Sequence, residues 1–411
     1  MPYESNDRLL RHFEEHGTDL TQQVDAQLQL VAPSSPNIPL YRDMILTVLR
    51  MAQDDRNRWN AKITLQAIRE LDNAFRVLEQ FKDRRKVTVF GSARTPVESP
   101  LYALAREVGA QLAQSDLMVI TGGGGGIMAA AHEGAGLEHS LGFNITLPFE
   151  QHANPTIDGT ENLLSFHFFF TRKLFFVKEA DALVLCPGGF GTLDEALEVL
   201  TLIQTGKSPL VPVVLLDAPG GGFWQGALDF IRSQLEANRY ILPTDLKLVR
   251  LVHSAEEAVD EINQFYANFH STRWLKREFV VRMNHPLSER ALAHLQSEFA
   301  SLRLSGEFQQ LAYTGEEHDE PRFSHLTRLV FNFNGRSSGR RGGAGAVRPS
   351  PCPRRRSAAP THRPSGGSRA SSGRFFVSEQ PRSDSTSKKA ADRLNGSAKS
   401  DGSIHRSGQN G

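Results

Sequence analysis

The chain has 411 residues, 39% of them hydrophobic and 23% charged, a length and composition that favour several domains with sizeable cores. Its formal net charge of +1 hides an asymmetry, because residues 334–411 hold 16 Lys and Arg against 4 Asp and Glu. Two cysteines exclude a disulfide framework and a cysteine-based zinc site, and no apolar run has membrane-spanning length. We therefore expect a soluble cytoplasmic protein with an acidic body, where any nucleic-acid binding is confined to the basic tail.

Residues 1–84 are predicted to be helical. Apolar residues repeat at three- and four-residue spacing between Asn60 and Phe81, which is typical of an amphipathic helix. A second helix is expected over Leu40–Ala52, after the breaker run Pro33–Pro36. No catalytic combination of residues occurs here, so we interpret the region as a docking or oligomerisation element.

Short apolar runs alternate with helical stretches over residues 85–270. The expected strands are Val87–Phe90, Leu117–Thr121, Phe143–Leu147, Leu163–Phe168, Ala182–Cys186 and Val211–Leu216, and the helices between them include Leu101–Gln114, Thr171–Ala180 and Leu193–Gln204. This alternation predicts an α/β domain with a parallel sheet covered by helices on both faces. Ligands of such sheets bind beyond the carboxyl ends of the strands, so the loops there are the candidate site.

Two further segments follow the α/β region. Residues 271–333 are expected to form a small α+β appendage, with strands at Glu278–Arg282, Phe308–Tyr313 and Leu326–Asn332 and a helix at Leu287–Leu302. Residues 334–411 are rich in Gly, Ser, Pro and Arg, which predicts a disordered tail. The tail is either an arginine-rich nucleic-acid-binding segment or a dispensable C-terminus, and its lack of repeated aromatic residues favours the second.

Glycine-containing loops follow the first two expected strands. The segment Gly91–Arg94 has small residues that let backbone amides approach a ligand closely. The run of five glycines at 122–126 exceeds the need of a turn, so we favour contact with a phosphate or sugar over a flexible connection. It is not a P-loop, because no Gly-Lys-Ser/Thr follows. The candidate binding residues are Gly91, Ser92, Gly122, Gly123 and Gly124.

The third loop, Cys186-Pro-Gly-Gly-Phe-Gly-Thr-Leu-Asp-Glu195, joins an expected strand to a helix that should begin near Thr192. A helix N-terminus presents free N–H groups and a positive dipole end, which makes a phosphate site without a lysine. The candidate phosphate-binding residues are Gly188, Gly189, Gly191 and Thr192.

Three charged residues near this loop each have two interpretations. From spacing alone, Glu195 would complete a capping box with Thr192, which is an ordinary structural role. Arg172 and Lys173 are either solvated charges or phosphate ligands, since they follow an expected strand and project toward the same sheet edge. The histidines show no metal-ligand spacing.

Taken together, these motifs resemble the Lonely Guy (LOG) family of nucleotide phosphoribohydrolases, historically labelled lysine decarboxylases. Pro187–Glu195 matches the family signature Pro-Gly-Gly-x-Gly-Thr-x-x-Glu, and the match extends in order through Phe90–Arg94, Gly122–Met128 and Thr171–Lys173. The resemblance covers residues 86–268 and implies a Rossmann-like doubly wound fold, a homodimer or higher homo-oligomer, and hydrolysis of nucleoside 5′-monophosphates.

The resemblance also implies roles for single residues. Arg172 and Glu195 would be the catalytic pair, and the third-loop glycines with Thr192 would hold the 5′-phosphate. No metal or other cofactor is expected. Two features depart from the short plant-type members: Ala129 follows Gly-Ile-Met in the second loop, and extra segments flank the domain, as in a longer bacterial branch. The base stays open between adenine, a prenylated adenine and another purine or pyrimidine, and a non-catalytic nucleotide or cofactor carrier on the same scaffold is the alternative.

Overall fold

The computed structural model describes residues 6–55, 57–146, 152–276, 278–313, 317 and 319–334. These residues belong to one unit, Met1–Cys352, within which the predicted domain boundaries stay predictions. The predicted basic tail lies outside the described residues, apart from Asn334. None of the described helices is long and apolar enough to cross a membrane.

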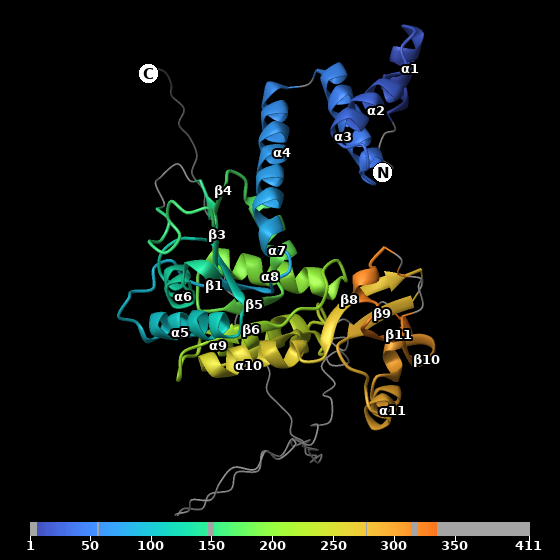
Figure 1. Cartoon of the computed structure of the whole chain (residues 1–411). Coiled ribbons are helices and arrows are strands. Elements are labelled where there is room, and N and C mark those ends of the chain that lie inside the picture. Colours follow the sequence, from blue (N-terminus) through green and yellow to red (C-terminus); the bar gives the residue numbers. More distant parts are fainter. Residues whose placement is uncertain are drawn as a thin grey trace, which may run out of the picture. The chain divides into compact units, whose positions relative to one another are not determined.

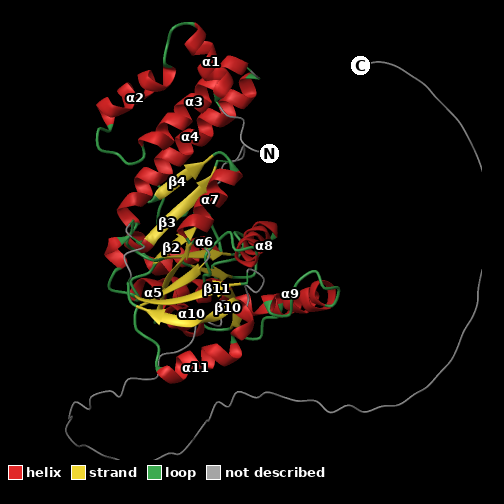
Figure 2. Cartoon of the chain, turned by 90° about the vertical axis from the view of Figure 1, so that its right-hand side faces the viewer, coloured by secondary structure: helices red, strands yellow, loops and turns green. Residues whose placement is uncertain are grey.

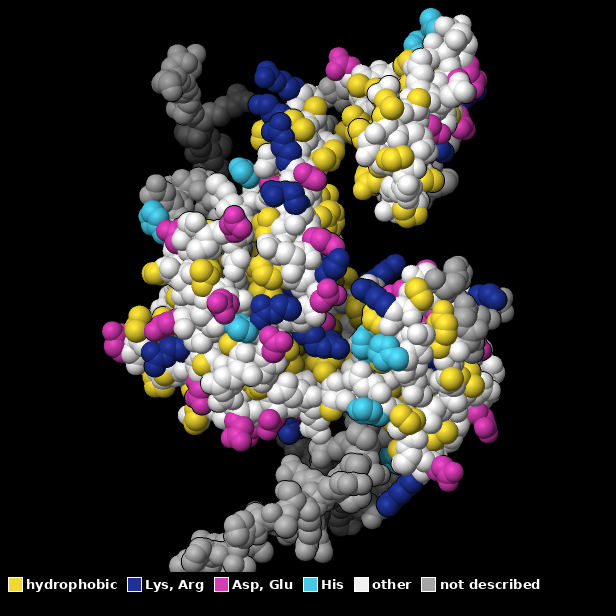
Figure 3. All heavy atoms as spheres, in the orientation of Figure 1, with side chains coloured by type: hydrophobic (Ala, Val, Ile, Leu, Met, Phe, Trp, Pro, Cys, Tyr) yellow, Lys and Arg dark blue, Asp and Glu magenta, His cyan; other side chains and the backbone are white. Residues whose placement is uncertain are grey.

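The N-terminal region is helical, as predicted, and contains α1 (Asp7–Glu15), α2 (Leu20–Val31), α3 (Ile38–Asp54) and α4 (Arg58–Leu78), which continues into η1 (Glu79–Phe81). Helices α1 to α3 share a small core that includes Leu9, Val24 and Leu46. Apolar side chains such as Leu40 and Met44 on α3 nevertheless remain exposed, and Figure 3 shows hydrophobic groups over these helices. This surface fits the predicted docking element.

A seven-stranded sheet forms the centre of the α/β region, in the order β4-β3-β2-β1-β5-β6-β7, and all neighbouring pairs are parallel. Its strands are β1 (Lys86–Phe90), β2 (Met118–Thr121), β3 (Ser140–Ile145), β4 (Leu163–Phe166), β5 (Ala182–Leu185), β6 (Val213–Leu216) and β7 (Val249–Val252). The predicted α/β class and parallel sheet are confirmed. Edge strand β7 was not predicted, because Arg250 interrupts its short apolar run.

Helices cover both faces of this sheet (Figures 1 and 2). One face packs against α5 (Pro100–Gln114), α6 (Ile127–Ala135) and α10 (Ala255–Tyr266). The other packs against α7 (Phe169–Glu179), α8 (Phe190–Gln204), α9 (Phe223–Phe230) and the C-terminal part of α4. Short helical segments η2 (Leu137–His139), η3 (Ile231–Glu236) and η4 (Asp245–Leu248) complete the region. Continuous apolar strands such as β5 are buried because both of their faces are covered.

The strand order places the switch point of the sheet between β1 and β5. From β1 the chain proceeds through α5 to β2 on one side, whereas from β5 it proceeds through α8 to β6 on the other. The loops after these two neighbouring strands therefore diverge and leave a crevice at the carboxyl edge. The first and third glycine loops are those two loops.

The C-terminal appendage is α+β, as predicted, with a four-stranded antiparallel sheet in the order β10-β11-β9-β8. Its elements are β8 (Phe269–Leu275), β9 (Glu278–Met283), α11 (Glu289–Glu298), η5 (Ala300–Leu302), β10 (Arg303–Leu311), η6 (Pro321–Phe323) and β11 (Thr327–Phe333). Strand β8 was not predicted and crosses the expected boundary at residue 270. Strand β10 begins before the expected Phe308, and the helix ends before the expected Leu302.

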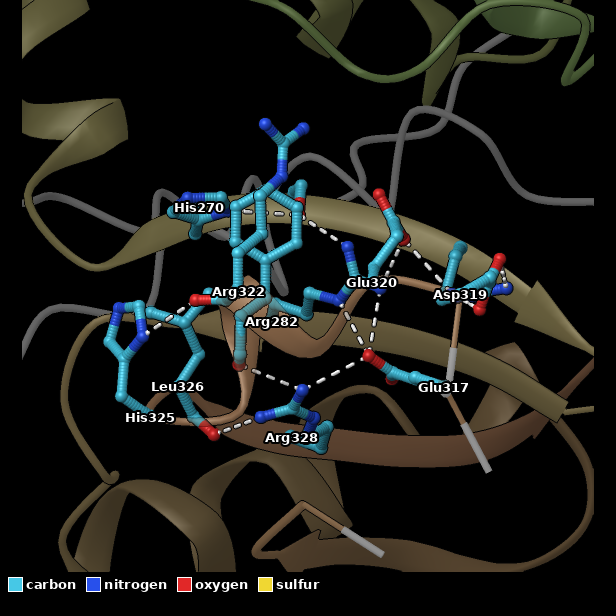
Figure 4. A network of polar contacts seen from close by, with 12 residues as sticks. His270, Arg282, Glu317, Asp319, Glu320, Arg322, His325, Leu326 and Arg328 are labelled. Atoms are coloured by element: carbon cyan, nitrogen blue, oxygen red, sulfur yellow. Dashed lines mark hydrogen bonds and ion pairs between the residues drawn. The ribbon is translucent and has the colours of Figure 1, made fainter. Parts of the chain in front are cut away.

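An ion network joins the appendage sheet to Glu317 and Glu320 (Figure 4). Arg282 on β9 donates to Glu317 at 2.8 Å and to Glu320 at 2.6 Å, and Arg328 on β11 donates to Glu317 at 3.0 Å. Arg282 is 2% exposed, so an unpaired charge there would be costly. The network thus pairs both buried arginines of this sheet, Arg282 and Arg328, with Glu317 or Glu320.

Candidate functional site

Backbone hydrogen bonds join the three glycine loops at the carboxyl edge of the sheet. The Ser92 N–H donates to the Pro187 carbonyl at 3.1 Å, and the Ile127 N–H donates to the Ser92 carbonyl at 3.0 Å. The first loop therefore lies between the other two and contacts both. Loops that lie far apart in the sequence, such as those of Ser92 and Pro187, form one continuous wall in this way.

Several loop glycines are required by this close approach. Gly126 has φ +60°, and a Cβ there would lie 2.3 Å from the Ser92 carbonyl oxygen. A Cβ on Gly188 would lie 2.2 Å from Thr192 Oγ1. At Gly189 and Gly191, by contrast, a Cβ would meet no protein atom within 4 Å. No described part of the chain explains these two glycines, which face the crevice.

The crevice is a pocket of about 470 Å³, within the range typical of small-molecule sites. Eight of the twelve residues predicted for the site line it: Gly91, Ser92, Gly122, Arg172, Gly189, Gly191, Thr192 and Glu195. The remaining four, Gly123, Gly124, Lys173 and Gly188, do not line it.

Contacts elsewhere account for three of these four residues. The carbonyl oxygens of Gly123 and Gly124 accept hydrogen bonds from Asn154 Nδ2 at 3.1 and 3.2 Å. The Lys173 ammonium forms ion pairs on α8 with Asp194 at 2.7 Å and Glu198 at 2.6 Å. We therefore place these residues in the support of the pocket and keep their direct contact with a ligand as an untested prediction.

Asn154 is itself held by a buried histidine. Its Nδ2 lies 3.1 Å from His132 Nδ1, and His132 Nε2 lies 3.2 Å from the Leu141 carbonyl oxygen. Burial lowers the pKa of His132 to about 4, so the ring is neutral at neutral pH. A neutral ring that donates from Nε2 accepts at Nδ1 from Asn154, which fixes the second loop.

Helix α8 begins at Phe190, earlier than the predicted start near Thr192. Its N-cap is Gly189, and no side chain caps it. Thr192 therefore lies inside the first turn, and the capping box with Glu195 is not formed. Among the described residues, no acceptor faces the N–H groups of Phe190 and Gly191, and the first turn holds no acidic residue. The first turn of α8 therefore presents uncapped N–H groups at the pocket.

Glu195 is a buried carboxylate without a hydrogen-bond partner on one oxygen. The residue is 4% exposed, and no described donor contacts its Oε2. Burial raises the pKa of Glu195 to about 7, against the opposing charges of Lys173 and Arg172. A carboxyl that titrates near neutrality in a pocket is typical of a functional site.

Arg172 faces the same pocket from α7. Its Nε is buried without a partner, and burial lowers the pKa of the guanidinium. The guanidinium carbon lies 5.0 Å from the Phe169 ring centroid and 5.4 Å from that of Phe176. No ion pair within 4.0 Å joins it to an acid among the residues described, so its donors are available to a ligand.

The sequence did not single out the aromatic lining of the pocket or Arg94. Phe169 and Phe190 line it and are 54% and 93% exposed, and Arg94 lines it with no ion pair among the described residues. Arg94 stood within the quoted first loop, and Phe190 within the third. Their positions beside glycines were the available signal.

Fold and pocket together define a doubly wound α/β protein with a glycine-walled pocket at its switch point. Residues 125–262 match a family model described as "Possible lysine decarboxylase". The cytokinin riboside 5′-monophosphate phosphoribohydrolase LOG1 of Arabidopsis thaliana is 30% identical over 185 residues, which cover 44% of this chain and 84% of that protein. LOG3 from the same plant is 28% identical over 187 residues, or 44% of this chain and 83% of that protein. The chain belongs to the LOG family.

Solved structures are also similar to part of this chain. The protein TM1055 is 28% identical and matches 44% of this chain and 99% of its own, with a TM-score of 0.33. A molybdenum cofactor carrier protein from Chlamydomonas reinhardtii is 22% identical and matches 44% of this chain and 97% of its own, with a TM-score of 0.31.

Proposed function

We propose that the chain hydrolyses the N-glycosidic bond of nucleoside 5′-monophosphates, releasing the free base and ribose 5-phosphate. AMP and cytokinin riboside 5′-monophosphates are the proposed substrates. The family relationship supports a hydrolase, and the observation that carries the proposal is Glu195. Its buried, unpartnered carboxylate shares one pocket with Arg172 and the N-terminus of α8.

The proposed phosphate position is the N-terminus of α8. The free N–H groups of Phe190 and Gly191 and the helix dipole attract the dianion, and open space at Gly189 and Gly191 admits its oxygens. Arg172 and Arg94 line the same pocket and supply positive charge. Binding energy from the phosphate then orients the ribose, although no bond to phosphorus changes.

Glu195 lies on the same helix, five residues after Phe190. At 1.5 Å rise per residue, that is about 7.5 Å along the axis from the first N–H group. This spacing suits a ribose held with its 5′-phosphate at the helix end and C1′ beside the carboxylate. As the glycosidic bond breaks, positive charge develops on C1′ and O4′, which an ionised Glu195 stabilises.

The reaction balances with water alone. The bonding pair leaves with the base nitrogen, which takes up a proton, and the hydroxide part of water joins C1′. Glu195 in its ionised form can orient that water or accept its proton. Because the hydrolysis changes no oxidation state, the proposed step needs no redox partner.

The test is incubation of the protein with a panel of nucleoside monophosphates, with EDTA present, scored by chromatography of released base. We expect base release from at least one monophosphate and much less from the matching nucleoside, which cannot occupy the phosphate position. Glu195→Gln and Arg172→Ala should each abolish most of the turnover, whereas Glu98→Gln, an exposed control, should not. Tight binding of AMP without base release would contradict the enzyme and favour a carrier.

We also propose a homodimer or higher homo-oligomer, as the family resemblance implies. Exposed apolar residues near the pocket support it: Phe169, Phe170, Phe190 and Leu197 are between 52% and 93% exposed. Such side chains are typical of surfaces that another chain covers. Sedimentation of a monomer at micromolar concentration would contradict the assignment.

A further inference from the structure

Helix α7, which carries Arg172, begins without a capping side chain of its own. Its N-cap residue is Phe168, and no side chain from the helix or its N-cap satisfies the first turn. A carboxylate from far earlier in the sequence lies beside this helix start. Glu70 on α4 accepts a hydrogen bond from the His167 N–H at 2.8 Å and another from Thr171 Oγ1.

Glu70 is held firmly in place. It is 5% exposed, and its Oε1 also accepts from Gln66 Nε2 at 3.1 Å, so both carboxylate oxygens are engaged. Two turns of α4 beyond Glu70 pack into the core, and the Phe75 ring lies 5.2 Å from that of Phe175 on α7. Helices α4 and α7 therefore fix each other at the residue that precedes Arg172.

This carboxylate is not a backbone cap, because it accepts from the His167 N–H, which precedes the helix, and from the Thr171 hydroxyl of the first turn. A negative charge at a helix N-terminus is stabilised by the dipole, and hydrogen bonds on either side of the N-cap residue fix where the helix begins. Arg172, the next residue after Thr171, has no acid of its own within ion-pair distance among the residues described. Its position is therefore set by the start of α7 and by the Phe169 and Phe176 rings.

We propose that Glu70 is a positioning residue for Arg172, acting through Thr171, so that α4 sets the geometry of the pocket. This inference rests on the proposed function only for its catalytic readout. Small displacements of a substrate-orienting group cost about a hundredfold in rate, so the effect is measurable without contact between Glu70 and substrate.

The experiment measures kcat and KM for AMP in Glu70→Ala, Glu70→Gln and Thr171→Val, each alone and combined with Arg172→Ala. We expect Glu70→Ala and Thr171→Val to lower kcat/KM by about tenfold to a hundredfold. Glu70→Gln should retain most of the activity, because its amide oxygen still accepts from His167 N–H. Asp72→Asn, an exposed carboxylate on the same helix, is the matched control and should be silent.

The double variants distinguish an effect of Glu70 on the position of Arg172 from a general loss of folded structure. If Glu70 acts through Arg172, Glu70→Ala adds little loss once Arg172 is already alanine. Full additivity in proteins that circular dichroism shows to be folded would overturn the proposal, and Thr171→Val gives the same comparison if Glu70→Ala does not fold. Crystal structures of the wild type and Thr171→Val give a readout independent of activity: an unmoved Arg172 refutes the inference even if AMP proves not to be a substrate.

Discussion

Replacement of Glu195 by glutamine gives opposite outcomes for activity and stability, which makes it the most informative single change. Glutamine keeps the shape of the side chain but removes the charge that would face the ribose cation. We expect turnover of AMP to fall by about a hundredfold or more, the usual scale for a positioned acid or base. In the wild type, kcat/KM should rise with pH through about 7, since the pKa of Glu195 is raised to about 7 and the ionised form is the active one.

The stability of the folded protein should move the other way. Below pH 4.5 the carboxyl is protonated in both the folded and the unfolded chain. As pH rises from 4.5 to about 7, the unfolded chain releases this proton while the folded protein retains it, so the free energy of unfolding falls. Above pH 7 the free energy of unfolding is lower by the full amount, about 3 kcal/mol for this change in pKa. Glu195→Gln removes that loss, and the variant should be the more stable protein at pH 8.

Urea denaturation of both proteins from pH 4 to pH 8 tests this reasoning. The difference in free energy of unfolding should grow with pH and approach about 3 kcal/mol in favour of the variant. Glu98→Gln serves as the control for loss of an exposed carboxylate and should show no such trend. A variant that is less stable than the wild type at pH 8 would refute the raised pKa of Glu195. A folded variant with near-normal turnover would refute its catalytic role.

Three other substitutions test the support of the site. Gly191→Ala should leave thermal stability unchanged or slightly higher, because its Cβ meets no protein atom, but should raise KM for AMP. Lys173→Met should leave KM nearly unchanged and move the acid limb of the pH–rate profile to higher pH, because the Lys173 charge lowers the pKa of Glu195. His132→Gln should reduce the acid sensitivity of the fold: the wild type, whose pKa of His132 is lowered to about 4, should lose about 2 kcal/mol between pH 7 and pH 5 through this residue, measured by urea denaturation.

The parallel sheet was predictable because its central strands are continuous apolar runs between helical stretches. Strand β5 is buried along its whole length, so every residue in it carries the same signal. The two strands that escaped prediction lack this property. Arg250 interrupts edge strand β7, and β8 is mostly polar, with only Phe269 buried. A strand at the edge of a sheet has fewer neighbours and needs fewer apolar residues, so its sequence resembles that of a loop.

The site was predictable as three loops but not in its side-chain details. The helix start was wrong because Thr192 followed by Glu195 has the spacing of a capping box, whereas the backbone turns into α8 already at Gly189. The partners of Lys173 lie on another helix and leave no local signal. Glu70 is the extreme case, since its contact with Thr171 spans 101 positions of the sequence.

Several features of the pocket lower the stability of the protein, so folding alone does not explain them. An unpartnered carboxylate oxygen on Glu195 and an unpartnered Nε on Arg172 each lower the stability of the fold that buries them. Gly191 lowers helix stability with no steric reason in the described chain. If stability were the only requirement, a neutral side chain at position 195 or an alanine at position 191 would serve better on the same backbone. A phosphorylated ligand with a cationic transition state would satisfy all three at once, which supports the proposed catalytic role of the pocket over a purely structural one.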